Sequence, residues 1–400
     1  MYDSTILKGI RVLDLTRYAS GPCCTQILGD MGADVWKVER PGTGDESRSF
    51  FPIKDGQSGY FHAYNRNKRS ISLNYTKPEG REILLELVKQ VDVVVENNAY
   101  GVMEKYNIGY DVLKEINPTL ILGSISGFGQ KNSPHLKKPA FDGVCQAMGG
   151  MISVTGYPEK SVKVGPCIVD NLGGIYCAMG ILAALYERSI SGKGQHVDVA
   201  MLDACIANLE SAITAYGFTG EPQPRYGNGH PSVGCTGAYD TLDGVNTIYM
   251  NCSSQKLADK IADAIGHPEL KTDDRFTSNS ARQQNSAFLD GLINEYTSKR
   301  TRAQILQEFA EAGIPCGPVN STEDVYKDPH GRMRGIIRDL DHPTIGKVSV
   351  AMTPICFSRT AIREDSTAAQ EVGESNDYIY QEILHKDAET LAKLRETKII

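Results

Sequence analysis

The first 125 residues alternate between short apolar runs and longer segments whose apolar residues recur with helical spacing. Four apolar runs are typical of strands: residues 10–15, 35–39, 91–95 and 120–125. Helical spacing occurs in three segments: residues 25–31, 78–90 and 102–115. Because strands that alternate with helices form parallel sheets covered by helices, the sequence predicts an α/β fold.

A long apolar segment, residues 171–187, contains Gly173, Gly174 and Gly180. Glycines allow a neighbouring backbone to approach closely, so this segment is predicted to be a helix packed tightly against another element. Residues 196–218 follow and are predicted to be rich in helix.

Glycine and proline crowd residues 220–231, which show no helical or strand period and are predicted to form a linker. The sequence therefore predicts three parts: a large domain over residues 1–220, a linker and smaller α+β domain over 221–325, and a return to the large domain over 326–400. The last part is predicted to end in surface helices over residues 366–400.

Composition and charge argue against several classes of partner and site. The chain has 400 residues and a formal net charge of -7, whereas nucleic-acid-binding domains usually have a basic surface, so no nucleic-acid partner is expected. The apolar stretches are judged too short to cross a bilayer, so no membrane partner is expected. None of the ten cysteines is spaced as C-x-x-C, which predicts a cytoplasmic protein without a zinc site or a disulfide framework.

The first predicted strand–helix–strand unit raises the alternative of a dinucleotide-binding enzyme, because Glu39 ends the second strand where a ribose-binding acid would lie. Such an enzyme needs G-x-G-x-x-G in the first turn, so that the backbone can approach the pyrophosphate. The turn here contains Gly21 followed directly by Pro22. The fingerprint is absent, and NAD-dependent chemistry is not expected.

Short motifs occur along almost the whole chain in a defined order. They include Gly32-Ala33-Asp34-Val35, Asn65-Arg66-Asn67-Lys68-Arg69, Val95-Glu96-Asn97, Ser126-Gly127-Phe128-Gly129, Gly192-Lys193-Gly194-Gln195 and Asp328-Pro329-His330. Each motif is weak alone, but the ordered set resembles the family III CoA-transferases. This resemblance implies a Rossmann-like parallel sheet, an interlocked homodimer, and an enzyme that moves CoA from an acyl-CoA to a free carboxylic acid.

The resemblance also implies that Asp170 is the nucleophile. In that chemistry, the carboxylate attacks an acyl-CoA thioester to give a mixed anhydride, and the CoA thiolate then forms an aspartyl-CoA thioester. The N-terminus of the following helix is expected to hold Asp170 ionised. From residue type alone, Asp170 could instead be only an N-cap. Asp142 matches an acid close to the nucleophile, where it would position Asp170 or tune its pKa; the alternative is that Asp142 caps the next helix.

The phosphates of CoA require fixed positive charges and hydrogen-bond donors. The candidates are Arg40, Lys68, Arg69, Asn97, Lys105 and Lys137. The first four are expected at or just after the carboxyl ends of strands, where open α/β sheets bind ligands. The alternative is that the cations are solvated surface residues. Acyl-CoA and small carboxylates are the expected substrates, and no metal or permanently bound cofactor is expected.

Two other functions remain as alternatives. A 2-methylacyl-CoA racemase-like enzyme would share the fold and the CoA site, but its proton-transferring histidine falls at Phe141, which carries no titratable group. A non-catalytic acyl-CoA-binding protein would keep Arg40 but would not need Asp170. Three aromatic residues, Phe50, Phe51 and Tyr60, could shape the acyl pocket or belong to the core.

Overall fold

The computed structural model describes residues 6–360 and 365–400, which divide into two compact units. Unit 1 comprises the chain up to Met151, Val164–Glu210 and His330–Ile400; unit 2 comprises Ile152–Lys163 and Ser211–Pro329. The sequence places residues 152–163 and 211–220 in the large domain, whereas the structure groups them with unit 2. One reason is that the Arg225 guanidinium donates a hydrogen bond to the Tyr157 carbonyl at 2.7 Å, which ties residues 152–163 to unit 2.

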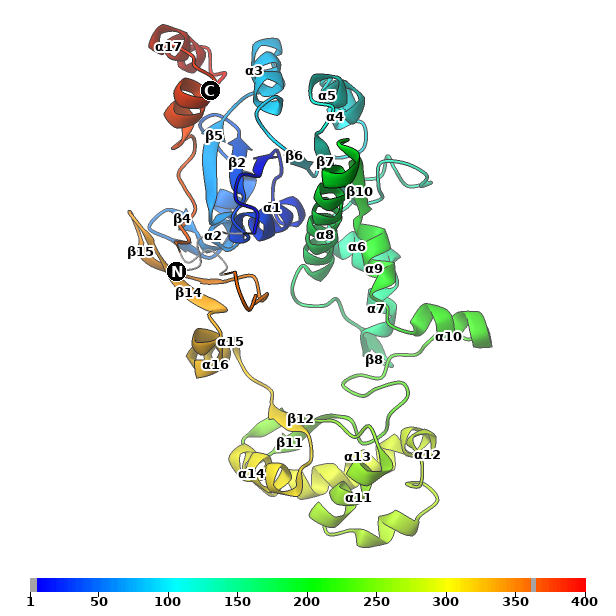
Figure 1. Cartoon of the computed structure of the whole chain (residues 1–400). Helices are drawn as coiled ribbons and strands as arrows, with labels where there is room; N and C mark the ends of the chain where they lie inside the picture. The colour runs from blue at the N-terminus through cyan, green and yellow to red at the C-terminus, as the bar shows by residue number, and fades with distance from the viewer. Residues whose placement is uncertain (1–5, 361–364) are drawn as a thin grey trace. The chain divides into compact units, whose positions relative to one another are not determined.

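The core of unit 1 is a parallel sheet with the strand order β10-β7-β6-β1-β2-β5 (Figure 1). Its strands are β1 (Arg11–Asp14), β2 (Asp34–Glu39), β5 (Lys68–Ser72), β6 (Val93–Glu96), β7 (Ile121–Ser126) and β10 (His196–Ala200). The predicted parallel α/β sheet is confirmed. The order reverses between β1 and β6, and open parallel sheets bind ligands beyond the carboxyl ends of their strands at such a reversal.

Two strands of this sheet are absent from the prediction. β5 begins with Lys68-Arg69-Ser70, whose polar side chains hide the apolar period of a strand. β10 lies at the edge of the sheet, and it occupies the start of the segment that was expected to be helical. Two short helices follow it, α9 (Met201–Ala207) and α10 (Ala212–Thr219).

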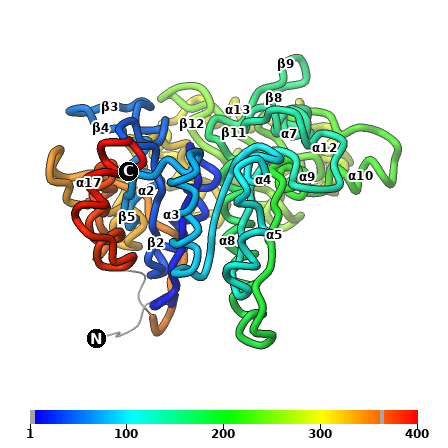
Figure 2. Tube along the Cα trace, turned by 90° about the horizontal axis from the view of Figure 1, so that it is seen from above, coloured from blue at the N-terminus to red at the C-terminus, as the bar shows by residue number. Residues whose placement is uncertain are grey.

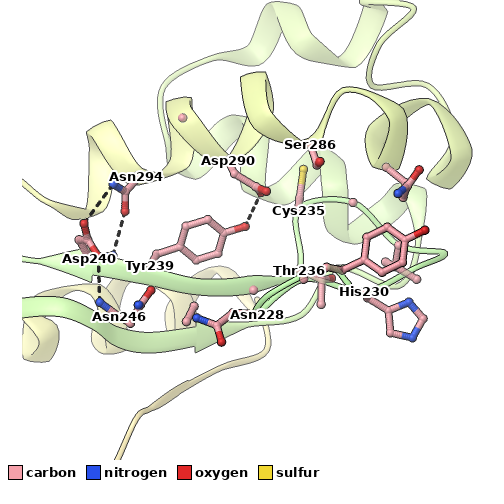
Figure 3. Close-up of a pocket in the computed structure, with 18 of the residues that line it drawn as sticks. Asn228, His230, Cys235, Thr236, Tyr239, Asp240, Asn246, Ser286, Asp290 and Asn294 are labelled. Atoms are coloured by element: carbon pink, nitrogen blue, oxygen red, sulfur yellow. Dashed lines mark hydrogen bonds between the residues drawn. The ribbon is translucent and has the colours of Figure 1, made fainter. Parts of the chain in front are cut away.

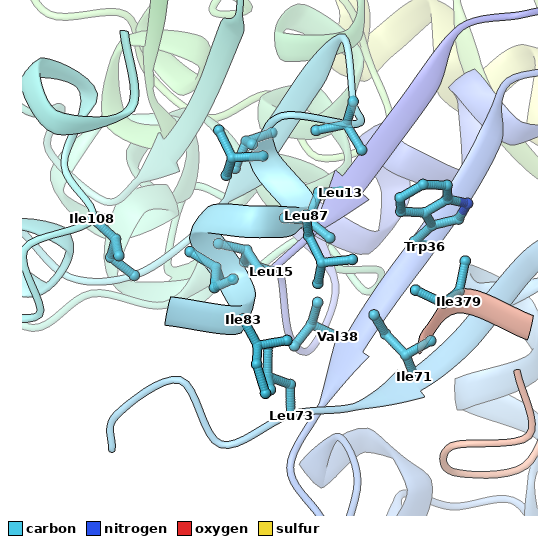
Figure 4. Close-up of a cluster of buried hydrophobic side chains, with 14 of the residues drawn as sticks. Leu13, Leu15, Trp36, Val38, Ile71, Leu73, Ile83, Leu87, Ile108 and Ile379 are labelled. Carbon is cyan, nitrogen blue, oxygen red and sulfur yellow. The ribbon is translucent and has the colours of Figure 1, made fainter. Parts of the chain in front are cut away.

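Helices cover one face of the sheet and form the main apolar core with it. Figure 4 shows side chains of α3 (Pro78–Val88) gathered over the strands, where Leu87 and Ile83 join Val38 in one buried cluster. The single helix expected over residues 102–115 is two helices, α4 (Val102–Lys105) and α5 (Tyr110–Ile116). The break occurs because Asn107 adopts a left-handed φ of 52°.

The C-terminal segment lies beside β5 and α3 (Figures 1 and 2). It contains a π-helix, η3 (Tyr378–Ile383), and α17 (Ala388–Glu396). The Tyr380 hydroxyl donates a hydrogen bond to the Ser72 carbonyl at 2.8 Å, and Ile379 and Leu391 are fully buried in the core cluster. Most residues of α17 are exposed, as predicted for a surface helix, while the buried side chains of this segment complete the core next to β5.

The opposite face carries α1 (Ser20–Asp30) and α8 (Ile168–Ser191). These two helices are so close that a Cβ atom on Gly174 would lie 2.6 Å from the Ser20 carbonyl oxygen. A Cβ atom on Gly180 would similarly lie 2.6 Å from a Val197 methyl group of β10. The predicted close packing of this glycine-containing helix is confirmed.

By length and composition, α8 is also apolar enough to cross a membrane, so the judgement that no segment reaches that length is wrong. Of its most apolar 18-residue window, 39% is buried within the fold, where the helix packs on α1, β7 and β10. Its outer side still exposes four large apolar residues: Ile175, Met179, Tyr186 and Ile190.

Unit 2 has its own sheet and core. Its antiparallel strands are β11 (Gly237–Thr241), β12 (Gly244–Met250) and β13 (Cys316–Pro318). Its larger helices are α11 (Gln255–Ala264), α12 (Asn279–Gln284), α13 (Ser286–Thr297) and α14 (Arg302–Ala312). Ile248, Phe276 and Phe309 are among the residues buried between the sheet and these helices.

A cavity of about 530 Å³ lies within unit 2, beside β11 and α13 (Figure 3). Two polar contacts cross it from strand to helix. The Tyr239 hydroxyl donates a hydrogen bond to Asp290 at 2.7 Å, and the Asp240 backbone N–H donates one to Asn294 at 2.8 Å. These contacts fix the hairpin on the helix.

Short elements complete the fold. In unit 1 they are η1 (Glu46–Ser49), β3 (Ile53–Lys54), β4 (Gln57–Ser58), α2 (Gly59–Asn65), α6 (Asp142–Met148), α16 (Pro329–Met333), β14 (Ile337–His342) and β15 (Gly346–Ala351). In unit 2 they are β8 (Gly156–Tyr157), β9 (Lys160–Ser161), η2 (Pro268–Thr272) and α15 (Thr322–Lys327), while α7 (Met151–Val154) spans the boundary between the units.

Candidate active site

Asp170 lies in the first turn of α8, where it is partly buried. Asp142, the first residue of α6, is buried beside it and binds the start of α8. The Asp142 Oδ1 atom accepts hydrogen bonds from the backbone N–H groups of Val169 at 2.9 Å and Asp170 at 3.4 Å. Gln146 holds the other oxygen of Asp142, because its amide donates to Oδ2 at 2.7 Å.

This geometry corrects two expectations. The N-cap of α8 is Cys167 and not Asp170, so the interpretation of Asp170 as only an N-cap is wrong. Asp142 caps α8 from outside and does not cap its own helix. The carboxylate of Asp142 therefore takes N–H groups of α8 that were expected to stabilise the charge on Asp170.

The charge on Asp170 is disfavoured as a result. Burial, followed by the nearby Asp142 carboxylate, raises the pKa of Asp170 to about 7, whereas the helix N-terminus was expected to keep it ionised. Ligand atoms of Asp142, Cys167 and Asp170 all lie within 4.8 Å of one another. A poorly stabilised carboxylate at neutral pH is a more reactive nucleophile than a solvated one.

Aromatic side chains lie near this carboxylate. The Tyr64 hydroxyl donates a hydrogen bond at 3.0 Å to the side chain of Asn171, the residue that follows Asp170 in α8. The rings of Tyr60 and Tyr64 are 5.3 Å apart, and burial together with nearby acidic groups raises the pKa of both hydroxyls. Tyr60 in turn contacts Phe50 at 5.4 Å. These rings form an apolar wall that was only partly foreseen, because Tyr64 was not singled out.

Two other aromatic residues, Phe141 and Phe51, are exposed. The Phe141 ring meets Tyr18 edge-on at 6.1 Å and is 66% exposed. Phe51, which was expected to join Phe50 in the acyl pocket, is 86% exposed. The structure thus brings together Phe50 and Tyr60 of the three predicted aromatics.

A cavity of about 190 Å³ lies at the carboxyl ends of the strands, next to the reversal of strand order. It is lined by Leu15, Arg17, Val38, Glu39, Arg40, Gly44, Asp45, Leu73, Asn74, Tyr75, Thr76, Asn98, Val102 and Tyr106. We call this the β1–β6 cavity. Arg40 follows β2 there, and its side chain is 59% exposed although it forms an ion pair with Glu46 at 3.4 Å.

Asn97 organises the loop beside this cavity. Its side chain accepts a hydrogen bond from the Arg17 N–H at 2.9 Å and donates one to the Arg17 carbonyl at 2.7 Å. It thereby joins the loops after β1 and β6 at the reversal of strand order. Lys105 is exposed in α4 with its ammonium 5.3 Å from the Tyr106 ring, and Lys137 is exposed in the loop before α6.

Lys68 and Arg69 lie elsewhere than expected, because they begin the unpredicted strand β5 instead of following a strand. The Lys68 ammonium is buried, 3.0 Å from the Asp14 carboxylate and 3.0 Å from the side-chain amide oxygen of Asn65. Arg69 forms an ion pair with Asp34 at 2.9 Å and stacks on a tyrosine ring. Both cations have partners inside unit 1.

The structure also brings in residues that sequence reasoning missed. Arg17, Tyr75, Tyr106 and Asn98 line the β1–β6 cavity together with Arg40. Tyr75 could have been found only by recognising β5, because it lies in the loop just after that strand. Asn98 follows the Val95-Glu96-Asn97 motif directly, so the motif could have been used to predict Asn98 as a site residue.

The fold and this site define a CoA-transferase. The sequence matches the family described as CoA-transferase family III over residues 7–376, and the chain belongs to that family. It is therefore an enzyme that transfers CoA between an acyl-CoA and a carboxylic acid, as the resemblance implied.

Individual relatives match over most of their length. A succinyl-CoA–D-citramalate CoA-transferase of Chloroflexus aurantiacus is 34% identical, over 98% of this chain and 98% of its own. A succinyl-CoA:glutarate CoA-transferase of Mus musculus is 34% identical, over 97% of this chain and 88% of its own. The crystal structure of a CAIB/BAIF family protein from Brucella suis superposes with a TM-score of 0.84 at 36% identity, covering 95% of this chain and 100% of that one.

Proposed function

We propose that Asp170 carries CoA through a covalent cycle. Its carboxylate attacks the thioester carbonyl of the donor, giving an acyl-aspartyl anhydride and CoA thiolate. The thiolate attacks the aspartyl carbonyl, which releases the donor acid and leaves an aspartyl-CoA thioester. The acceptor carboxylate opens that thioester to a second anhydride, and the returning thiolate takes the acceptor acyl group and frees Asp170.

The observation that carries this proposal is the environment of Asp170. A carboxylate with a pKa near 7, beside a second carboxylate and an aromatic wall, is destabilised as an anion and so gains from becoming acylated. Asp142 positions Asp170 by holding the start of α8. We assign no proton transfer to Asp142, because no step of the cycle moves a proton.

We infer that the β1–β6 cavity holds the nucleotide part of CoA. Arg40 is its exposed cation at the carboxyl edge of the sheet, and Asn97 fixes the loop that forms one wall. Lys105 and Lys137 remain further candidates for the phosphates. Lys68 is proposed to act structurally, because its ammonium is already satisfied by Asp14.

We propose succinyl-CoA as the donor and a small dicarboxylate as the acceptor. This is supported by the names of relatives, which include CoA-transferases for D-citramalate, mesaconate and glutarate. We also propose that the sheet is Rossmann-like, that unit 2 is the smaller α+β domain, and that the enzyme is an interlocked homodimer in the cytoplasm. The exposed apolar side of α8 supports the homodimer, because a second copy could cover it. The ten free cysteines support the cytoplasmic location.

The experiment is a substrate panel. The enzyme is incubated with succinyl-CoA and either glutarate, mesaconate, D-citramalate, oxalate or acetate, and the CoA esters are identified by mass. We expect a new CoA ester with at least one dicarboxylate, loss of that product in Asp170→Asn, and full activity in Asp274→Asn, which changes an exposed aspartate of unit 2. Undiminished transfer in Asp170→Asn would contradict the covalent cycle.

A further inference from the structure

Five aromatic side chains of unit 1 lie in a row that begins beside Asp142 and ends beside Asp170. In order, they are Phe141, Tyr18, Phe50, Tyr60 and Tyr64. The centroids of neighbouring rings in this order are 5.3–6.1 Å apart, so each ring contacts the next. We call these five residues the aromatic row.

Both ends of the aromatic row are close to the nucleophile. Phe141 directly precedes Asp142, whose carboxylate accepts a hydrogen bond from the Asp170 N–H at 3.4 Å. At the other end, the Tyr64 hydroxyl donates a hydrogen bond at 3.0 Å to the side chain of the residue after Asp170. Burial raises the pKa of the Tyr60 and Tyr64 hydroxyls most, and the nearby Asp170 carboxylate raises it further. The aromatic row therefore covers one side of Asp170.

Tyr18 joins the two ends of the row. Its ring centroid is 6.1 Å from that of Phe50 and 6.1 Å from that of Phe141, which it meets edge-on. Among the residues that the structure describes, no other ring contact joins Phe141 to Phe50. Because a tyrosine ring is larger than a water molecule, its removal would open a path for water between these two rings.

The backbone of Tyr18 is strained. Its φ of 66° is left-handed, a conformation that bulky residues rarely adopt. Contacts on both sides enforce it: the Asn97 side chain bonds the N–H and the carbonyl of Arg17 at 2.9 and 2.7 Å, and Asp45 accepts the Tyr18 N–H at 3.3 Å. Such strain persists where the surrounding structure enforces it, and it is concentrated at functional sites. Here it directs the ring of Tyr18 into the aromatic row.

The position of Tyr18 matters for the covalent cycle. Tyr18 follows Arg17, which lines the β1–β6 cavity, so it connects the proposed CoA cavity with the rings beside Asp170. A thioester or an anhydride on Asp170 can react with water as well as with the acceptor acid. Attack of water on the aspartyl carbonyl forms a C–O bond and breaks the C–S bond. The CoA thiolate leaves with one proton of the water, and Asp170 returns to a carboxylic acid.

We propose that the ring of Tyr18 completes the aromatic row over Asp170 and thereby protects the covalent intermediates from hydrolysis. The inference rests on the proposed covalent cycle and adds to it a residue that takes part in no bond-making step. The contribution of Tyr18 is therefore measured by the ratio of hydrolysis to transfer.

The test uses Tyr18→Gly and Tyr18→Asn, two replacements that suit a left-handed backbone and remove the ring. Each enzyme is incubated with succinyl-CoA alone, and the free CoA formed over many turnovers is measured by chromatography. Exchange of isotope-labelled succinate into succinyl-CoA measures transfer in parallel. We expect the ratio of hydrolysis to exchange to rise about 10-fold in both variants, because two ring contacts that exclude water are lost.

Three control enzymes accompany this test. Tyr18→Phe keeps the ring, and Phe51→Ala removes an 86% exposed ring outside the aromatic row, so both should hydrolyse succinyl-CoA like the wild type. The gain of hydrolysis should vanish when Tyr18→Gly is combined with Asp170→Asn. A destabilised fold would lower both rates and would not raise hydrolysis alone, so a purely structural role of Tyr18 predicts no gain.

The outcomes separate this inference from the proposed function. If the wild type exchanges succinate but neither ring-removing variant gains hydrolysis, the inference is wrong and the covalent cycle stands. The inference is also wrong if Phe51→Ala gains as much hydrolysis as Tyr18→Gly. If the wild type shows no exchange, or if the gain persists without the Asp170 carboxylate, the proposed cycle is wrong and the inference falls with it.

Discussion

Replacing Asp170 with asparagine is predicted to stabilise unit 1 while it abolishes CoA transfer. Burial and the nearby Asp142 raise the pKa of Asp170 to about 7, so the ionised side chain lowers the free energy of unfolding. Asparagine keeps the shape of the neutral acid and removes the charge. Active-site residues commonly reduce stability in this way for the sake of reactivity.

The sign and size follow from the two pKa values. The unfolded chain has the ordinary pKa of 3.8 and the folded chain a pKa of about 7. Because the folded value is the higher one, Asp170 costs nothing below about pH 3.8, and the cost grows until about pH 7. A difference of about 3 in pKa corresponds to roughly 4 kcal/mol, and partial exposure of the carboxylate reduces our expectation to about 1–3 kcal/mol.

The measurement uses Trp36, the only tryptophan of the chain, which is fully buried in β2 and reports the unfolding of unit 1. Urea denaturation is followed by its fluorescence at about pH 8.5 and about pH 4, for the wild type, Asp170→Asn and the control Asp274→Asn. We expect Asp170→Asn to gain stability at the higher pH only. A variant no more stable than the wild type at about pH 8.5, or an equal gain at both pH values, would refute the reasoning.

Three further predictions concern neighbouring residues. Arg40→Ala should raise KM for acyl-CoA about 10-fold with little change in kcat, because a phosphate contact is lost; an unchanged KM in steady-state kinetics would exclude that contact. The kcat/KM of the wild type should rise with pH through about 7 as Asp170 ionises. Asp142→Asn should move this rise to lower pH, because a like charge near Asp170 is removed. A pH–rate profile that is the same in the variant and the wild type would contradict the electrostatic effect of Asp142 on Asp170. Lys68→Met should destabilise unit 1 by about 1–3 kcal/mol, because the buried Asp14 carboxylate would lose its ion pair but keep its threonine donors, and should leave KM unchanged; tryptophan fluorescence measures the stability and steady-state kinetics the KM.

The sheet was predictable wherever a strand carries a simple apolar run. β6 and β7 show such runs, because they lie inside the sheet with both faces covered. β5 and β10 were missed because they lie at the two edges of the sheet, where polar side chains replace the apolar period. The surface that the C-terminal helices cover could not be predicted either, since only the folded structure shows what Leu391 packs against.

The proximity of two candidate residues, Asp170 and Asp142, was predictable from the resemblance, but their electrostatic arrangement was not. The ordered motifs identify Asp170 and Asp142, which the structure places in contact through the backbone of α8. The sequence could not show that Asp142 takes the N–H groups of that helix, because the two segments are far apart along the chain. The same limit applies to Lys68, whose partner Asp14 lies on another strand.

The account rests most directly on a covalent bond between CoA and one aspartate. The enzyme is mixed with succinyl-CoA without an acceptor, quenched with acid, digested, and the peptide that contains Asp170 is weighed by mass spectrometry. We predict a peptide heavier by one CoA minus water, absent in Asp170→Asn and discharged when the acceptor acid is added before the quench. Continued turnover with no adduct on that peptide, or an adduct on another residue, would contradict the account.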